Sequence, residues 1–73
     1  MTMYVIEGVL GSVVGRVRTI DEAIRTVLGQ MNMSDKAERK LRNRLEATVL
    51  GRVSVDWGGA GCTVHIIDDE TDE

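Results

Sequence analysis

Residues 52–67, RVSVDWGGAGCTVHII, place a cluster of glycines between two segments in which apolar and polar side chains alternate. Such alternation is typical of strands that bury one face, and glycines supply the positive φ angles of a tight turn. With residues 58–61 as the loop, one face becomes entirely apolar, which favours an antiparallel β-hairpin. The predicted register pairs Trp57 with Cys62, Val55 with Val64, and Val53 with Ile66.

Two helices are predicted between residues 19 and 50. Thr19 and Glu22 form a capping box, and Ser34 is a good N-cap for a second helix. Gly29 and Gly51 are expected to end the two helices. Each helix has mainly apolar residues at helical spacing on one face. They are Ile20, Ala23, Ile24, Val27, Leu28 and Met31 in the first helix, and Ala37, Leu41, Leu45, Thr48 and Val49 in the second.

The N-terminal residues 3–18 leave two readings open. Gly11 and Ser12 can form a two-residue turn, which would place Glu7 opposite Arg16 as a cross-strand charge pair. A single long bent strand is the alternative. Either way, we expect an α+β domain in residues 1–67, with an antiparallel sheet in the order β(β)ααββ and a helical hairpin on one face. Residues 68–73 are expected to form an acidic, disordered tail.

The chain is short, and its means of stabilisation are few. A domain of 73 residues buries only about 60% of the surface that its unfolded chain exposes. Its one cysteine excludes an internal disulfide, and one cysteine with one histidine argues against a zinc site. Because small domains often rely on a partner subunit, and because residues 3–17 carry apolar side chains on two faces, we expect a homodimer.

Several features of the sequence bear on location. No segment reaches the roughly 18 apolar residues of a membrane span. The N-terminal segment MTMYVIEGVL lacks a basic region and contains Glu7, so we do not expect a signal peptide. A lone thiol fits a reducing compartment, and we expect the protein in the cytoplasm, without membrane contact.

Charge is unevenly distributed along the chain. Residues 68–73, DDETDE, contain five of the twelve carboxylates, whereas residues 1–67 contain nine bases and seven acids. Within that part, residues 36–52 contain six bases and only two acids. The net charge of −3 therefore averages a basic helix and an acidic tail.

Catalytic arrangements find little support in the sequence. A strand follows the glycine cluster, whereas a phosphate-binding loop needs the N-terminus of a helix there. Cys62 and His65 lie three apart on a strand and hence on opposite faces. Ser54, Asp56 and His65 share the polar face, with Ser54 opposite His65, but a two-stranded face offers no oxyanion hole. We therefore predict no enzyme, no metal and no cofactor.

The basic helix and Trp57 are the better candidates for a binding site. A helix pair whose second helix is basic, followed by a glycine-tipped hairpin, loosely resembles a helix-turn-helix with a wing, although a third helix is missing. The alternative for a basic helix is a solvated face with local ion pairs, and the alternative for Trp57 is a core residue that closes the hairpin. The predicted partner-binding residues are Arg39, Lys40, Arg42, Arg44, Trp57, Asp68, Asp69 and Glu70.

These observations favour a small, non-enzymatic protein-interaction module that acts by occupying the surface of another macromolecule. Phage-encoded inhibitors of host defence systems, such as anti-CRISPR proteins, are chains of this type, and the comparison is one of type only. A small DNA-binding regulator that uses residues 36–52 is the alternative. In that case binding to duplex DNA should weaken steeply with salt. An enzyme whose site crosses a subunit interface ranks third.

Overall fold

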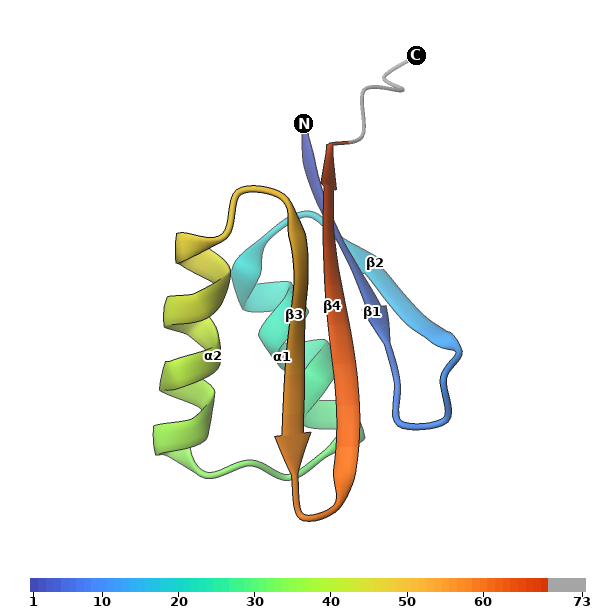
Figure 1. Cartoon of the computed structure of the whole chain (residues 1–73), viewed down its shortest axis with the longest axis vertical. Helices are drawn as coiled ribbons and strands as arrows, with labels where there is room; N and C mark the ends of the chain where they lie inside the picture. The colour runs from blue at the N-terminus through green and yellow to red at the C-terminus, as the bar shows by residue number, and fades with distance from the viewer. Residues whose placement is uncertain (69–73) are drawn as a thin grey trace.

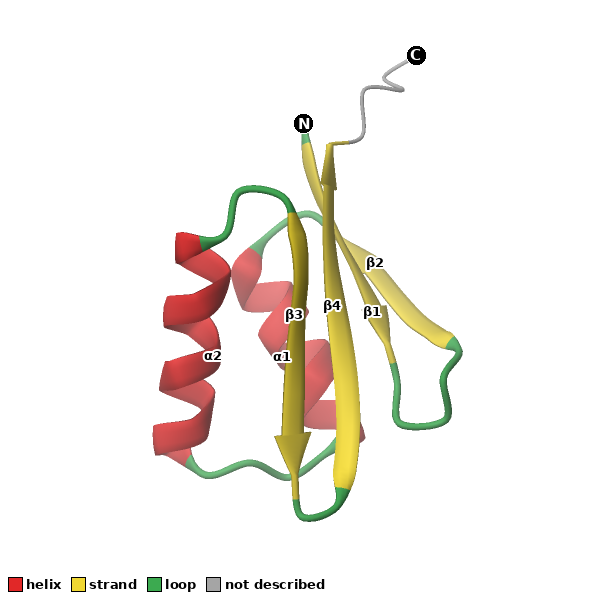
Figure 2. Ribbon diagram, in the orientation of Figure 1, coloured by secondary structure: helices red, strands yellow, loops and turns green. Residues whose placement is uncertain are grey.

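The described residues form two hairpins of strands with a pair of helices between them in the sequence (Figure 1). The computed structural model describes residues 1–68. The elements are β1 (Thr2–Glu7), β2 (Val13–Val17), α1 (Ile20–Gln30), α2 (Asp35–Ala47), β3 (Gly51–Trp57) and β4 (Ala60–Asp68). The strands form one antiparallel sheet in the order β2-β1-β4-β3. The expected α+β class and the helical hairpin on one face are therefore confirmed (Figure 2).

The N-terminal segment is a hairpin, and the single bent strand is excluded. Its register differs from the prediction, because Arg16 lies opposite Val5 and Glu7 lies opposite Val13, after an irregularity between Ile6 and Glu7. The predicted Glu7–Arg16 pair is therefore wrong. The connection is longer than the two-residue turn that we expected. It spans residues 8–12, and the N–H of Gly8 donates to the carbonyl of Ser12 at 2.8 Å.

The C-terminal hairpin has a shorter turn than predicted. Gly58 and Gly59 alone form it, with φ angles of 61° and 86°. Positive φ at both central residues gives the two-residue turn whose twist matches that of the strands. The observed register pairs Trp57 with Ala60, Val55 with Cys62, and Val53 with Val64. The predicted register was wrong by two residues, but each side chain keeps its face, because the faces of a strand repeat every two residues.

Both predicted helix starts are confirmed. The side-chain oxygen of Thr19 accepts from the N–H of Glu22 at 3.1 Å, and that of Ser34 accepts from the N–H of Ala37 at 3.2 Å. The predicted helix ends were wrong. Helix α1 continues past Gly29 to Gln30. Helix α2 ends at Ala47, and Gly51, with a φ of 133°, is the first residue of β3 and not the cap of α2.

The core lies between the helices and one face of the sheet. Ile6, Val27 and Val64 are completely buried there, and the core is aliphatic apart from Tyr4 and Cys62. Val49, which we expected on the buried stripe of α2, lies beyond the end of the helix and is 80% exposed. The buried residues are Tyr4, Ile6, Ala23, Ile24, Val27, Met31, Leu41, Leu45, Val53, Val55, Cys62, Val64 and Ile66.

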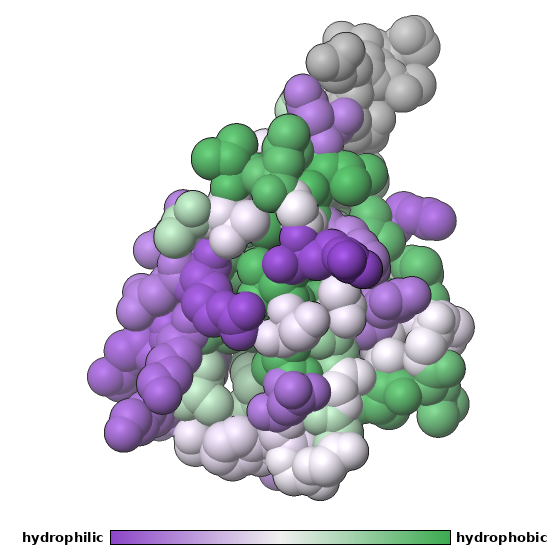
Figure 3. All heavy atoms as spheres, in the orientation of Figure 1, coloured by the Kyte–Doolittle hydropathy of each residue, from purple (hydrophilic) through white to green (hydrophobic). Residues whose placement is uncertain are grey.

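The surface carries distinct apolar and hydrophilic regions. Hydrophilic side chains gather along α2, and hydrophobic ones gather near the end of β4 and at the β1–β2 turn (Figure 3). The exposed apolar residues near the first of these regions are Val49, Leu50 and Ile67, and those near the second are Val9, Leu10, Val13 and Val14. Neither helix in residues 1–68 has the length and apolar character that crossing a membrane requires.

Candidate interaction groove

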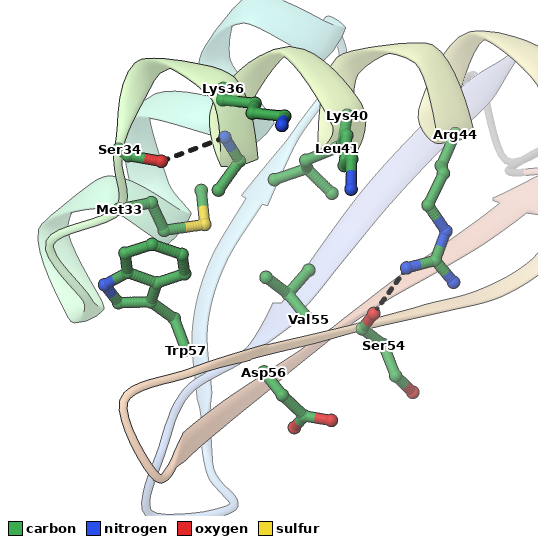
Figure 4. A pocket seen from close by; sticks show the side chains of 11 residues that line it. Met33, Ser34, Lys36, Lys40, Leu41, Arg44, Ser54, Val55, Asp56 and Trp57 are labelled. Carbon is green, nitrogen blue, oxygen red and sulfur yellow. Dashed lines mark hydrogen bonds between the residues drawn. The ribbon is translucent and has the colours of Figure 1, made fainter.

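A groove of about 450 Å³ runs between α2, from Lys36 to Arg44, and the second half of β3 (Figure 4). We call it the α2–β3 groove. Its walls come from segments about twenty residues apart in the sequence, which meet because α2 packs beside β3. It is lined by Met33, Ser34, Lys36, Ala37, Lys40, Leu41, Arg44, Ser54, Val55, Asp56 and Trp57.

The inner surface of the groove is apolar. Leu41 and Val55 belong to the core, and their side chains lie between α2 and β3 (Figure 4). Trp57 lies beside Met33 at one end of the groove (Figure 4). Trp57 is the last residue of β3 and is on the same strand face as Val55, but it lies where the helix layer no longer covers it and remains 40% exposed. An apolar surface of this kind can hold an apolar side chain of a binding partner.

Three cations line the α2 side of the groove. Lys36, Lys40 and Arg44 follow one another at intervals of four, which places them in one row along the helix. We call them the cationic row. All three are exposed, and Nη1 of Arg44 donates to the carbonyl oxygen of Ser54 at 2.8 Å. The row therefore borders the apolar surface with positive charge, and Arg44 links it to the backbone of β3.

The opposite side of the groove is the edge of the sheet, because β3 is the last strand in the order β2-β1-β4-β3. The carbonyl of Ser54 points away from β4, since it accepts from Arg44 of α2. In antiparallel strands the backbone groups of every second residue point to the same side. The N–H and carbonyl groups of Asp56 hence also point away from β4 and toward the groove.

The predicted site residues do not all meet at this groove. The structure brings together Lys40, Arg44 and Trp57. Arg39 and Arg42 instead line a separate shallow depression on α2 with Asp35 and Glu38.

Arg42 contacts α1, because its Nη1 lies 2.6 Å from Oδ1 of Asp21. The hydrogen bond to Asp21 raises the pKa of Arg42 above its ordinary value. Asp68 lies at the end of β4, 3.0 Å from the amino group of Met1. It therefore belongs to the sheet and not to the tail, while the predicted residues Asp69 and Glu70 lie outside the described part of the chain.

Sequence reasoning missed several residues of the groove. The position of Lys36 beside Lys40 could have been inferred, because residues four apart lie on the same side of a helix. The carbonyl of Ser54 and the neighbours of Trp57 carried no such signal. Met33 reaches Trp57 only through the way in which α2 and β3 pack.

The structure does not assemble the serine, aspartate and histidine that share the polar face. Ser54 lies opposite Thr63, whereas His65 lies opposite Arg52, so the predicted pairing of Ser54 with His65 was wrong. Nε2 of His65 is instead 3.2 Å from Oε1 of Glu7 on β1. In residues 1–68, no three His, Cys, Asp or Glu side chains gather where they could hold a metal ion.

The thiol of Cys62 is turned into the core, opposite Val55. Its burial raises the pKa of the thiol, which favours the protonated, unreactive form. His65 lies on the other face of the same strand, as the alternation of side chains predicts.

Comparisons with known proteins do not indicate a function for this chain. No model of a protein family matches the chain, and neither a curated protein nor a solved structure is similar enough to count as a match. The function must therefore be argued from the geometry and charge of the surface itself.

Proposed function

We propose that this chain is a non-enzymatic protein-interaction module that binds a partner protein in the α2–β3 groove. The observation that carries the proposal is that an apolar surface, a row of cations and an open strand edge meet in one groove. Trp57 is of a residue type that often dominates binding energy at protein interfaces. An inhibitor of the phage-encoded kind would act in this way, by occupying the surface of its partner.

The alternative of DNA binding through residues 36–52 receives less support from the contacts of the helix. Arg42 is held by Asp21, and Arg44 is held by the carbonyl of Ser54. Two of the basic side chains that would contact phosphates are thus already engaged within the protein. DNA binding remains an outcome that the experiment below can reveal.

We further propose that two copies pair through the edge strand β2. This strand is the other end of the sheet, and it exposes Val13 and Val14 beside Leu10 of the turn, which is 91% exposed. Unpaired strand edges with apolar side chains readily pair with another chain.

We also propose that the protein acts in the cytoplasm. A reducing compartment of this kind suits the lone, buried thiol of Cys62.

Photo-crosslinking in the native host tests the proposed function. Benzoylphenylalanine replaces Lys36 in the groove or, as a control, Arg25 on α1, which does not line the groove. We expect protein adducts from position 36 that resist nuclease, that are absent from position 25, and that disappear when Trp57→Ala is added. Adducts that are nuclease-sensitive, equal at both positions, or unaffected by Trp57→Ala would contradict the proposal.

A further inference from the structure

We propose that the α2–β3 groove takes an extended acidic peptide segment, which adds to β3 as a further strand. The inference rests on the proposed function and names the chemistry of the partner. In this mode of recognition, backbone hydrogen bonds to a sheet edge supply affinity, and pockets for alternate side chains supply specificity. The α2–β3 groove offers both features side by side.

The backbone of β3 sets the conformation of the ligand. Asp56 directs its N–H and carbonyl groups into the groove, and Ser54 directs its own to the same side. An extended segment can pair with these groups at the usual strand spacing of about 4.8 Å. Because Arg44 already occupies the carbonyl of Ser54, it marks the end of the pairing, and a ligand helix would leave the groups of Asp56 without partners.

The positive charge of the groove favours a ligand with negative charge. Its lining contains three cations and one carboxylate, that of Asp56, whereas the whole chain has a net charge of −3. The groove is thus a positive region on an acidic protein, and it is complementary to aspartate and glutamate side chains. Lys40 and Arg44 extend from α2 toward β3, where such side chains would lie (Figure 4).

The alternation of side chains on a strand sets the spacing within the ligand. Every second side chain of the added segment would face the helix layer. One of these would pack on Trp57 and Met33, and the next, two residues away, would meet Lys40. The side chain between them would face the carboxylate of Asp56, where an acidic residue is disfavoured. The preferred segment therefore has an apolar residue and an acidic residue two positions apart, with a non-acidic residue between them.

Fluorescence anisotropy with synthetic peptides and the full-length chain tests this inference. The probe is a labelled threonine-rich octapeptide that carries a leucine and an aspartate two positions apart. We expect saturable binding that Trp57→Ala weakens by about 30-fold. Lys40→Glu should weaken it by about tenfold. Arg25→Glu makes the same charge change on α1, outside the groove, and should leave binding unchanged.

Two further probes separate strand addition from simple charge attraction. Methylation of the probe's amide nitrogens at one set of alternate positions should abolish binding, while methylation at the other set should not. The hexapeptide DDETDE, which has the sequence of residues 68–73 and no apolar residue, should bind far more weakly than the probe. Equal tolerance of both methylation patterns, equally tight binding of DDETDE, or tighter binding of duplex DNA would overturn the inference.

The controls keep the inference distinct from the proposed function. Circular dichroism shows whether each variant is folded, and Trp57→Leu and Lys40→Gln serve as milder variants if the first ones unfold. If the probe fails to bind but the crosslinks from position 36 still depend on Trp57, the groove binds a protein of other chemistry and only this inference falls. If both experiments fail, the proposed function falls as well.

Discussion

The two edges of the sheet differ in what lies beside them. β3 is flanked by α2, whose Leu41 and Leu45 are buried in the core together with Val53 of the strand. Within residues 1–68, β2 has no element on its outer side, and the neighbouring turn exposes Leu10 almost completely. On the proposals above, the flanking helix makes the β3 edge selective for the strand that it accepts, whereas the β2 edge, without such a helix, can pair with another copy.

The two edges also differ in the side chains that surround them. The cationic row borders the β3 edge, while the β1–β2 hairpin exposes the apolar side chains of Val9, Leu10, Val13 and Val14. Charged residues near an edge oppose unspecific pairing, and exposed apolar patches mark interaction surfaces. We therefore expect the β3 edge to recognise a ligand of defined charge, and the β2 edge to recognise a second copy.

The largest expected effect concerns the packing of α2. Leu45 is 1% exposed, and we expect Leu45→Ala to lower the free energy of unfolding by about 2–5 kcal/mol, because it leaves a cavity in the core. Val13 on the bare edge is 47% exposed, and Val13→Ala should change the free energy by less than about 0.5 kcal/mol in the monomer. Urea denaturation at low protein concentration measures both. Equal losses of unfolding free energy in the two variants would show that the buried Leu45 of α2 stabilises the fold no more than the exposed Val13 of β2 does.

The second prediction concerns self-association at the bare edge. We expect light scattering at micromolar concentration to report about twice the chain mass of 8.0 kDa. Leu10→Lys combined with Val13→Lys should weaken the dimer at least about tenfold, because charges on an edge oppose pairing. Val49→Lys alters another exposed apolar residue, outside the β1–β2 hairpin, and should leave the dimer intact. A monomer at all concentrations, or a dimer sensitive only to Val49→Lys, would remove β2 from the interface.

A third prediction tests the contact that ties α2 to β3. Arg44→Ala removes the hydrogen bond to the carbonyl of Ser54 and should destabilise the fold by about 0.5–1.5 kcal/mol. Hydrogen exchange gives a local readout. The amide of Val55, which points toward β4, should be well protected, whereas that of Asp56, which points into the groove, should exchange quickly until the acidic probe is added. Fast exchange at Val55 would contradict the register of the C-terminal hairpin.

The smallest expected effect concerns the buried thiol of Cys62, which lies on β4 opposite Val55 of β3. Burial raises the pKa of Cys62, so the folded state holds this proton more tightly than the unfolded state. The stabilising contribution is complete below the ordinary thiol pKa and is lost as the pH rises through the raised one. The urea midpoint should therefore fall more steeply above about pH 9 in the natural chain than in Cys62→Ala. Parallel curves would show that the thiol does not contribute.

The sequence predicted the elements of the fold better than it predicted their pairing. The side chains of Thr19 and Ser34 signal helix starts because capping depends on neighbours three residues away, and both predictions are confirmed. The register of both hairpins was wrong, although the faces of Val53 and Val55 were right. In the C-terminal hairpin the error is a shift by two residues, which conserves every face, so an apolar pattern cannot detect it and the number of residues in the turn decides.

The candidate site shows the same division. The basic helix and Trp57 could be found from the sequence, since an excess of charge and a rare residue are visible without coordinates. Helical spacing already places Arg42 and Arg44, two residues apart, on different sides of α2. The partners of the two sides could not be found in this way, because Asp21 of α1 and the carbonyl of Ser54 in β3 reach α2 only through the tertiary packing.

The sequence by itself determined where both helices begin, that residues 52–67 form a hairpin, and which face of that hairpin is apolar, because these follow from side-chain alternation, helical spacing and capping over a few residues. Only the tertiary structure decided that β1 pairs with β4, which leaves β3 and β2 as the two edges. That choice depends on how α1 and α2 share the apolar face of the sheet, and it involves contacts between segments far apart in the chain. The α2–β3 groove exists for this reason, since Trp57 and Lys40 become neighbours only when the helix pair packs beside an edge strand.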